Sequence, residues 1–256
     1  MTLKEWNRLK QIPITDISPV DWKKATQIPI EDNGEPLVPV SLSPERVLTR
    51  PQYFLQGLPG AISDCYVRCQ VWQRLRQTAE QLPDGYKLVV LDGYRPERLQ
   101  IFLFDRLLNE FRNAFPDKEQ AELEQMTTRY VARPGNGLKS PTPHSTGGAV
   151  DLMIVDARGN FLDMGSGFDE NSPCAATGYF ESLLSGGDRL SSREIESAQN
   201  RRAFYHIMTR AGFCNYPEEW WHFDFGDQVW ACSTPDPGSA RAIYGRAVMP
   251  GPPSIL

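Results

Sequence analysis

The sequence predicts an α+β domain in which helices pack on a small sheet. Three observations support this prediction. Apolar residues recur at helical spacing in several long windows, and short aliphatic runs between turn residues are typical of buried strands. The two kinds of segment also follow one another in mixed order with irregular connections, which fits helices packed on a small sheet.

The first predicted helix covers residues 67–82, because apolar side chains recur there every three or four positions and Pro83-Asp84-Gly85 then supplies a turn. Residues 86–91 are mostly aliphatic and predict a buried strand, which Asp92-Gly93-Tyr94-Arg95-Pro96 ends. A second helix is predicted from 96 to 111, with proline at its first position and apolar residues on one face.

Residues 119–131 predict a third helix, and residues 149–155 predict a second strand. The aliphatic side chains of that strand share one face, so Asp151 points away from the aliphatic core. A further helix is expected over 193–211, and the aromatic run over 220–225 predicts a third strand.

The ends of the chain carry no such pattern. We expect one domain over 1–256, consisting of a Pro-rich arm over 1–50, a core over 51–235 and a Pro- and Gly-rich tail over 236–256. The density of proline in the first fifty residues forbids long helices there and suggests an extended arm wrapped over the domain.

Composition excludes several classes of protein. Lys and Arg number 27 against 32 Asp and Glu, for a net charge of −5 and a pI near 5.3, which argues against a nucleic-acid or anionic-membrane binder. No apolar run approaches the roughly 20 residues of a membrane span. The first residues lack the apolar stretch of an export signal, so we expect a cytoplasmic protein.

Five cysteines cannot all pair, and a reducing compartment favours free thiols. We interpret them as buried small apolar residues. Cys65 and Cys69 are close enough in sequence to share a metal, but no second cysteine pair stands at the spacing of a zinc site.

Histidine is scarce, and two of the three histidines lie in unusual surroundings. His144 precedes a Gly-Gly turn that leads to Asp151, and His222 lies in an aromatic run. His206 lies in a helical pattern with no carboxylate motif and is interpreted as structural. Taken singly, a histidine beside tryptophan is usually a core residue, and an Asp after a Gly-Gly turn is often a local cap.

Together, two imidazoles and one carboxylate are a ligand set that suits Zn²⁺ and leaves a fourth position for water, as in catalytic zinc sites. A base must accept the proton of that water, and Glu219 is the candidate because it lies three residues before His222. In a regular strand these two positions face opposite sides, so Glu219 should precede the strand or lie at a bulge.

Four motifs, in their order along the chain, resemble those of the zinc D-alanyl-D-alanine dipeptidases, which are related to D,D-carboxypeptidases and hedgehog-type domains. The motifs are Asp92-Gly93-Tyr94-Arg95-Pro96, His144-x-x-Gly147-x-Ala149-x-Asp151, Gly165-Ser166-Gly167-Phe168-Asp169 and Glu219-Trp220-Trp221-His222. The resemblance spans roughly residues 53–225 and implies that the sheet is small and mainly antiparallel, as in those domains.

The resemblance implies a zinc metallopeptidase that hydrolyses D-alanyl-D-alanine and takes part in the turnover of cell-wall peptides. The implied ligands of one zinc ion per chain are His144, Asp151 and His222. The implied catalytic residues are Glu219, as base and later proton donor, and Arg95, as oxyanion stabiliser.

The implied substrate-binding residues are Asp169 for the ammonium group, with Tyr94 and Thr142 beside the substrate. Thr142 stands where the family usually has serine, so the hydroxyl is kept. Each role has a structural alternative: Arg95 could form a turn ion pair with Asp92, Asp169 could be a turn carboxylate, and Tyr94 could simply pack.

Two other functions compete with the dipeptidase. A D,D-carboxypeptidase that trims longer cell-wall peptides would share the ligand set, but its substrate lies outside the membrane and no export signal is found. A non-catalytic, zinc-bearing peptide-binding module would need neither Glu219 nor Arg95. The expected partner is therefore a small dipeptide, with no nucleic acid and no membrane.

Overall fold

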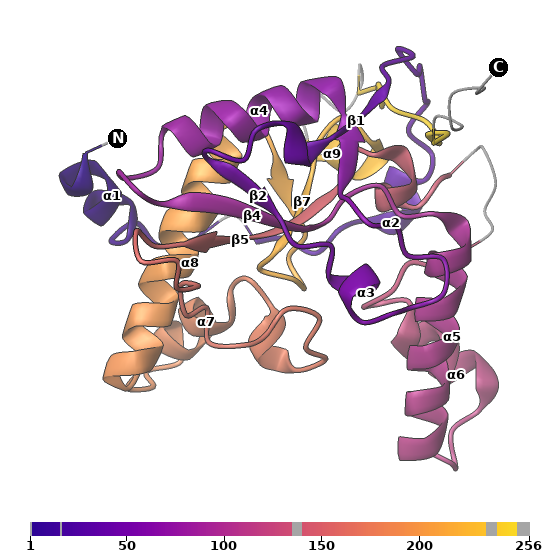
Figure 1. Ribbon diagram of the computed structural model, residues 1–256. Helices are drawn as coiled ribbons and strands as arrows, with labels where there is room; N and C mark the ends of the chain where they lie inside the picture. The colour runs from indigo at the N-terminus through magenta and orange to yellow at the C-terminus, as the bar shows by residue number, and fades with distance from the viewer. Residues whose placement is uncertain (1, 16, 135–139, 234–239, 250–256) are drawn as a thin grey trace, which may run out of the picture.

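The computed structural model describes residues 2–15, 17–134, 140–233 and 240–249 (Figure 1). It confirms the α+β class with a mainly antiparallel sheet. The main sheet has the strand order β2-β4-β5-β7-β6, in which only the β2–β4 pair is parallel. In that order the strands are Val47–Thr49, Lys87–Asp92, Val150–Val155, His222–Asp224 and Cys214–Asn215. A separate antiparallel pair joins β1 (Leu37–Pro39) to β3 (Tyr66–Arg68).

Helices surround the sheet, and short 3₁₀ turns lie between them. The helices are α1 (Leu3–Leu9), α2 (Trp22–Ala25), α3 (Gln52–Leu55), α4 (Cys69–Glu80), α5 (Glu97–Ala114), α6 (Gln120–Thr127), α7 (Tyr179–Ser185), α8 (Ser192–Arg210) and α9 (Gln228–Cys232). The 3₁₀ turns are η1 (Val40–Leu42), η2 (Pro143–Thr146) and η3 (Pro173–Ala175). Helices α5 and α6 pack on each other and project from the body of the domain (Figure 1).

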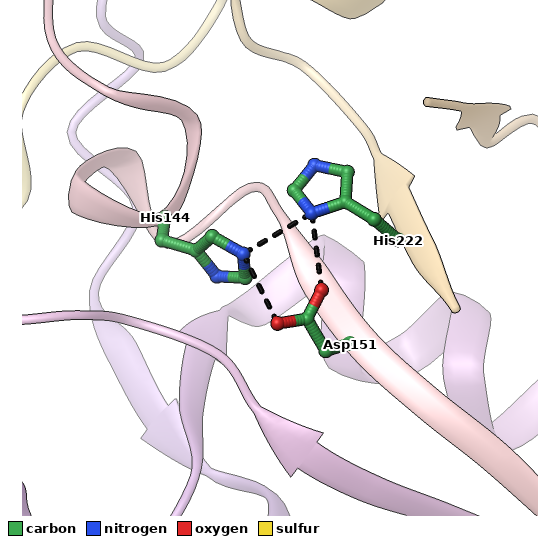
Figure 2. A group of neighbouring side chains, drawn as sticks. All are labelled: His144, Asp151 and His222. Carbon is green, nitrogen blue, oxygen red and sulfur yellow. Dashed lines mark hydrogen bonds and ion pairs between the residues drawn. The ribbon is translucent and has the colours of Figure 1, made fainter. Parts of the chain in front are cut away.

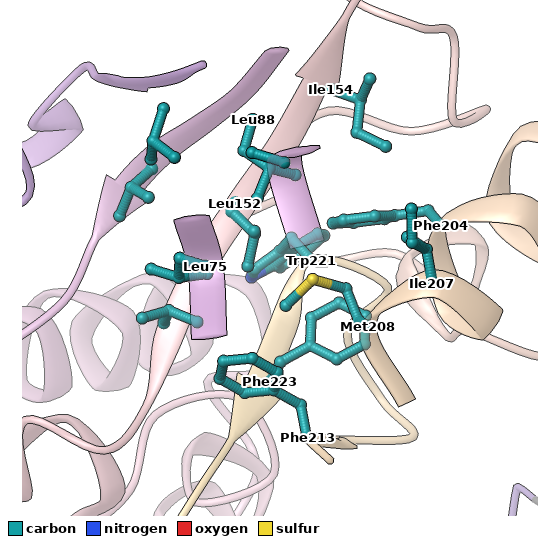
Figure 3. Packing of buried hydrophobic residues seen from close by; sticks show 14 of the residues in the cluster. Leu75, Leu88, Leu152, Ile154, Phe204, Ile207, Met208, Phe213, Trp221 and Phe223 are labelled. Atoms are coloured by element: carbon teal, nitrogen blue, oxygen red, sulfur yellow. The ribbon is translucent and has the colours of Figure 1, made fainter. Parts of the chain in front are cut away.

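The main hydrophobic core lies on one face of the sheet, between the strands and helices α4 and α8 (Figure 3). Leu75 of α4 and Phe204 of α8 meet the aliphatic residues of β4 and β5 there, and Phe223 of β7 closes the cluster. Strand β5 alternates as its sequence predicts, with Leu152 fully buried in this core. The opposite face is therefore free to carry polar groups.

The register of the central strands brings polar residues together on that opposite face. Asp92 of β4 pairs with Asp151 of β5, and Asp151 pairs with His222 of β7. A β-bulge between Val90 and Asp92 ends the regular ladder at this point. Three neighbouring strands thus present two carboxylates and an imidazole side by side.

The predicted helices and strands of the core are present, with ends that differ by a few residues. The largest difference is in the helix predicted over 119–131, which covers only Gln120–Thr127; the strand predicted over 220–225 is reduced to His222–Asp224. The helix predicted from 67 begins at Cys69 because the preceding residues pair with β1.

The expectation of an extended arm over 1–50 was wrong in part. Helix α1 begins with a capping box at Thr2 and buries Trp6 and Leu9 in the main core. Strand β2 forms an edge of the main sheet itself. In the described part of the tail, Tyr244 is fully buried, and Ala242 forms a parallel bridge with Ile30 of the arm. The described segments near both ends are therefore built into the domain.

All five cysteines lie in described segments and carry free thiols, and only Cys65 is buried. The interpretation of all five as buried apolar residues therefore holds for that one alone. In the described ranges, no helix combines the length and the apolar character that crossing a membrane requires.

Burial in the core predicts that replacing two different leucines by alanine has unequal effects on stability. Leu75→Ala removes a fully buried side chain of α4 and should lower the free energy of unfolding by about 2–5 kcal/mol, through lost burial and a residual cavity. Leu184→Ala in α7, where the leucine is 42% exposed, is the control and should cost about 0.5 kcal/mol or less. Urea unfolding at a fixed metal concentration measures both. Equal losses would contradict the described core.

Candidate metal centre and its cavity

His144, Asp151 and His222 converge at the polar face of the sheet (Figure 2). His144 Nε2 lies 3.2 Å from His222 Nδ1 and 3.4 Å from Asp151 Oδ2, and His222 Nδ1 lies 3.0 Å from Asp151 Oδ1. Tetrahedral zinc with bonds of about 2.0–2.1 Å holds its ligand atoms about 3.3 Å apart. The three residues therefore approach one another at about the spacing that a zinc ion requires, with a different oxygen of Asp151 nearest to each imidazole.

The second nitrogen of each imidazole has a fixed partner. His144 Nδ1 lies 2.8 Å from the carbonyl oxygen of Gly93, and His222 Nε2 lies 2.9 Å from Asp224 Oδ1. Donation from those nitrogens leaves the lone pairs of His144 Nε2 and His222 Nδ1 directed at the centre. These outer contacts set the tautomer and the orientation of both rings, which is the arrangement typical of metal-bound histidines.

Local backbone geometry explains how His144 reaches the site. It lies in turn η2, which Gly147 ends in the left-handed conformation at φ +72°. The carbonyl of Gly93 approaches the ring closely, and a Cβ at Gly93 would stand 2.5 Å from the carbonyl oxygen of Tyr66. Both glycines are therefore required by the backbone path around the site.

Asp151 is buried between the two imidazoles and the guanidinium of Arg95. Burial alone would raise the pKa of this carboxyl, but the neighbouring His144 and His222 hold it well below its usual range. Asp151 is thus an anion in the folded protein, which is the form that binds a metal. The donor set of two imidazoles and one carboxylate fits Zn²⁺.

Arg95 follows β4 and is held on several sides. Its Nε donates to Asp92 at 2.8 Å, Nη1 donates to Gln100 at 3.1 Å, and Nη2 lies 3.5 Å from both Tyr53 Oη and Asp151 Oδ2. Its guanidinium is buried yet lines the cavity at the candidate metal centre. The turn ion pair between Arg95 and Asp92 is therefore present, and the same contact orients the guanidinium of Arg95 toward the cavity.

Glu219 lines the same cavity and lies just before β7, as its spacing from His222 predicts. Its Oε2 lies 3.9 Å from His222 Nδ1. Burial raises the pKa of Glu219 to about 8, with the nearby charge of His222 acting in the opposite direction. A cation at the three donors would also favour the ionised form. The carboxyl is therefore placed where it can exchange a proton near neutral pH.

The structure brings two of the three predicted substrate-binding residues to the cavity. Asp169 lines it and lies 3.6 Å from Nη2 of Arg106, and burial raises the pKa of its carboxyl. Thr142 lines it at the start of turn η2. Tyr94 does not line the cavity: its backbone N–H bonds the carbonyl of Tyr66, and its side chain is half-buried elsewhere. The expectation for Tyr94 therefore finds no support, because the turn directs only Arg95 inward.

Sequence reasoning missed several residues of the site. Tyr53, Gln100 and Arg106 line the cavity and contact Arg95 or Asp169. Asp224, behind His222, could have been found, because residues two apart in a strand share a face. No local motif marks the other three, of which Tyr53 lies in α3 and Gln100 and Arg106 lie in α5.

The chain is similar in sequence to one family of known proteins. The family described as D-ala-D-ala dipeptidase matches residues 64–239. D-alanyl-D-alanine dipeptidases of Synechocystis and Escherichia coli are both 34% identical to the chain; the first alignment covers 80% of this chain and 87% of the relative, and the second covers 55% of each. That of Enterococcus faecalis is 35% identical over 56% of this chain and 64% of the relative.

Among solved structures, a vancomycin-resistance D,D-pentapeptidase in complex with Zn(II) covers 82% of this chain and 92% of its own, with 15% identity and a TM-score of 0.38. That likeness is too low to compare the two sites. The family match spans the segments that supply every candidate metal ligand and Glu219. The chain belongs to the D-Ala-D-Ala dipeptidase family.

Proposed function

We propose that this protein is a zinc-dependent dipeptidase that hydrolyses D-alanyl-D-alanine to two molecules of D-alanine. The observation that carries the proposal is the convergence of three metal-type donors, a buried glutamate and a buried arginine on one cavity. A non-catalytic peptide-binding module would need neither the buried glutamate nor the buried arginine. The relatives bear the dipeptidase name, and the chain covers 87% of the Synechocystis protein.

The zinc ion would be held by His144, Asp151 and His222. Bound zinc supplies Lewis acidity, which lowers the pKa of a water molecule toward about 7 and polarises a carbonyl group. Asp224 and the carbonyl of Gly93 keep the two imidazoles in the tautomers that such binding needs.

Glu219 acts as the base and then as the acid. Its carboxylate takes a proton from the attacking water as the new C–O bond forms at the scissile carbonyl. It then passes that proton to the departing nitrogen as the C–N bond breaks, so that the products are two amino acids. A carboxyl whose pKa is raised by burial suits both halves of this transfer.

Arg95 stabilises the negative charge that develops on the carbonyl oxygen. Its guanidinium is held in place by Asp92, Gln100 and Tyr53 before substrate arrives, so little reorganisation accompanies the reaction. Asp169, at another part of the cavity wall, binds the free ammonium group of the dipeptide. The cytoplasmic location and the role in cell-wall peptide turnover stay predictions.

The metal assignment predicts which histidines matter for zinc. His144→Ala and His222→Ala should each lose the single zinc ion and melt at a lower temperature, because metal affinity for the native state adds to folding stability. His206→Ala is the control, since His206 bonds the carbonyl of Ile12 away from the cavity. Metal analysis and thermal unfolding measure both effects. A full equivalent of zinc in either ligand variant would refute the assignment.

The two catalytic assignments predict different kinetics. Glu219→Gln should abolish turnover while zinc is retained, and Arg95→Lys should lower kcat about 10²- to 10³-fold, because a donor to the transition state is displaced. Glu218→Gln is the matched control; that glutamate pairs with Arg129 at 3.6 Å and does not line the cavity. Steady-state kinetics with metal analysis decide the matter. Near-normal turnover by Glu219→Gln, with loss in Glu218→Gln, would transfer the role of base to Glu218.

Amine recognition by Asp169 predicts a preference for a free dipeptide. An N-acetylated dipeptide or a cell-wall pentapeptide offers a neutral amide and leaves the carboxylate without its partner, which costs about 2–5 kcal/mol, or about 30- to several-thousand-fold in kcat/KM. Asp169→Asn should remove most of this preference. Comparison of kcat/KM for the three substrates tests it, and equal hydrolysis of free and blocked dipeptides would favour a D,D-carboxypeptidase.

A further inference from the structure

The segment that carries Asp169 has little regular structure of its own. Between the bridge at Phe161 and turn η3 it forms no helix or strand. Gly165 adopts φ +87°, and among the described residues Asp169 is the one non-glycine residue with a positive φ, at +62°. Aspartate tolerates this conformation better than most residues, but a free loop would not keep it. The segment therefore needs restraint from outside.

Arg201 of α8 supplies that restraint. Its guanidinium donates from Nε to the carbonyl of Met164 at 2.6 Å, from Nη2 to that of Cys174 at 2.6 Å, and from Nη1 to that of Ala176 at 2.7 Å. These carbonyls lie on both sides of Asp169 in the sequence. One side chain therefore joins the two ends of the segment and fixes the loop between them.

Arg201 acts as a clamp: it holds the loop through backbone carbonyls and not through an ion pair. It is 2% exposed, and no carboxylate of the described residues pairs with it. Its guanidinium lies over the rings of Phe180 and Trp220, at 4.7 and 5.9 Å from their centroids. Burial lowers the pKa of Arg201 to about 10, so the group stays charged at neutral pH. Hydrogen bonds from a charged donor to three carbonyls offset the cost of its burial.

The clamp also reaches the segment that carries the catalytic glutamate. Trp220, next to Glu219, donates from its backbone N–H to the carbonyl of Ala175 at 3.0 Å and from Nε1 to Ser166 Oγ at 2.9 Å. Phe168 packs against Trp221 on the same side. A loop fixed by Arg201 thus keeps a constant position relative to Glu219.

We propose that Arg201 is a positioning residue for substrate specificity: it holds the loop of residues 164–176 so that Asp169 faces the amino group of the dipeptide. This inference rests on the proposed function, in which Asp169 binds that ammonium group. Arg201 contacts neither the substrate nor the metal ligands. Its loss should therefore affect amine recognition far more than zinc binding.

The chain offers a matched control in the next residue of α8. Arg202 is also largely buried and pairs with Glu181 through bonds of 2.6 and 2.7 Å, but it bonds no residue of the 164–176 loop. The experiment compares Arg201→Gln, Arg201→Lys and Arg202→Gln as zinc-loaded proteins. It measures zinc content, hydrogen exchange of peptides from residues 163–176, and kcat/KM for D-alanyl-D-alanine and its N-acetylated form.

We expect Arg201→Gln to keep its zinc, to exchange faster in residues 163–176, and to lose about tenfold or more of its preference for the free dipeptide, mainly through KM. Arg201→Lys keeps the charge but not the fork of donors, so it should recover only part of the preference. Arg202→Gln should exchange in this segment and discriminate as the wild type does. Should Arg201→Gln fail to fold, Arg201→Lys carries the same comparison.

Three outcomes would overturn the inference. If the Arg201 variants keep the preference for the free dipeptide, the inference is wrong and the proposed function still stands. Unchanged exchange of residues 163–176 would show that Arg201 does not hold the loop, whatever the kinetics. Equal hydrolysis of both dipeptides by the wild-type protein would instead contradict amine binding by Asp169, and with it the specificity role of Arg201.

Discussion

The buried carboxylate of Asp151 is the point on which the rest of the site depends. It stands on the polar face of β5, between two imidazoles and the guanidinium of Arg95. The opposite face of the same strand is packed in the main core, so β5 cannot shift by one residue without exposing its aliphatic side chains and burying the wrong set. Core packing therefore fixes the register that places Asp151 opposite His222.

Charge explains why such a site calls for a cation. Asp92, Asp151 and Asp224 are all buried around the two imidazoles; Arg95 pairs with Asp92 and Asp151, and His222 Nε2 contacts Asp224. One side chain cannot balance that many carboxylates in a medium of low dielectric constant. A divalent ion at the three donors supplies the missing charge. Metal binding and the stability of the folded site are therefore linked in this protein.

The sequence predicts the features that short stretches of the chain determine. Alternation in β5, helical spacing in α4 and α8, and the two histidine motifs led to the core and the metal centre. The elements within the Pro-rich arm were missed because short helices and strands such as α1 and β2 form through contacts with the distant core. Tyr94 was predicted at the site but does not line the cavity, because side-chain direction in a tight turn depends on backbone path, which spacing does not reveal. Arg201 has no motif, since its partners are carbonyls far along the chain.

The two halves of the site are built on supports of different kinds. Asp151 and His222 lie in strands, His144 lies in the turn before β5, and Arg95 lies just after β4, so backbone pairing and the core hold this half rigidly. Asp169 lies in a loop that has no ladder, and side chains from α8 hold it in place. With the role proposed for Asp169, a change in that loop or in its clamp would alter which amine is accepted while the donors of the metal keep their geometry. The metal donors therefore rest on contacts separate from those of Asp169, whereas the segment of Glu219 is bonded to the same loop through Trp220.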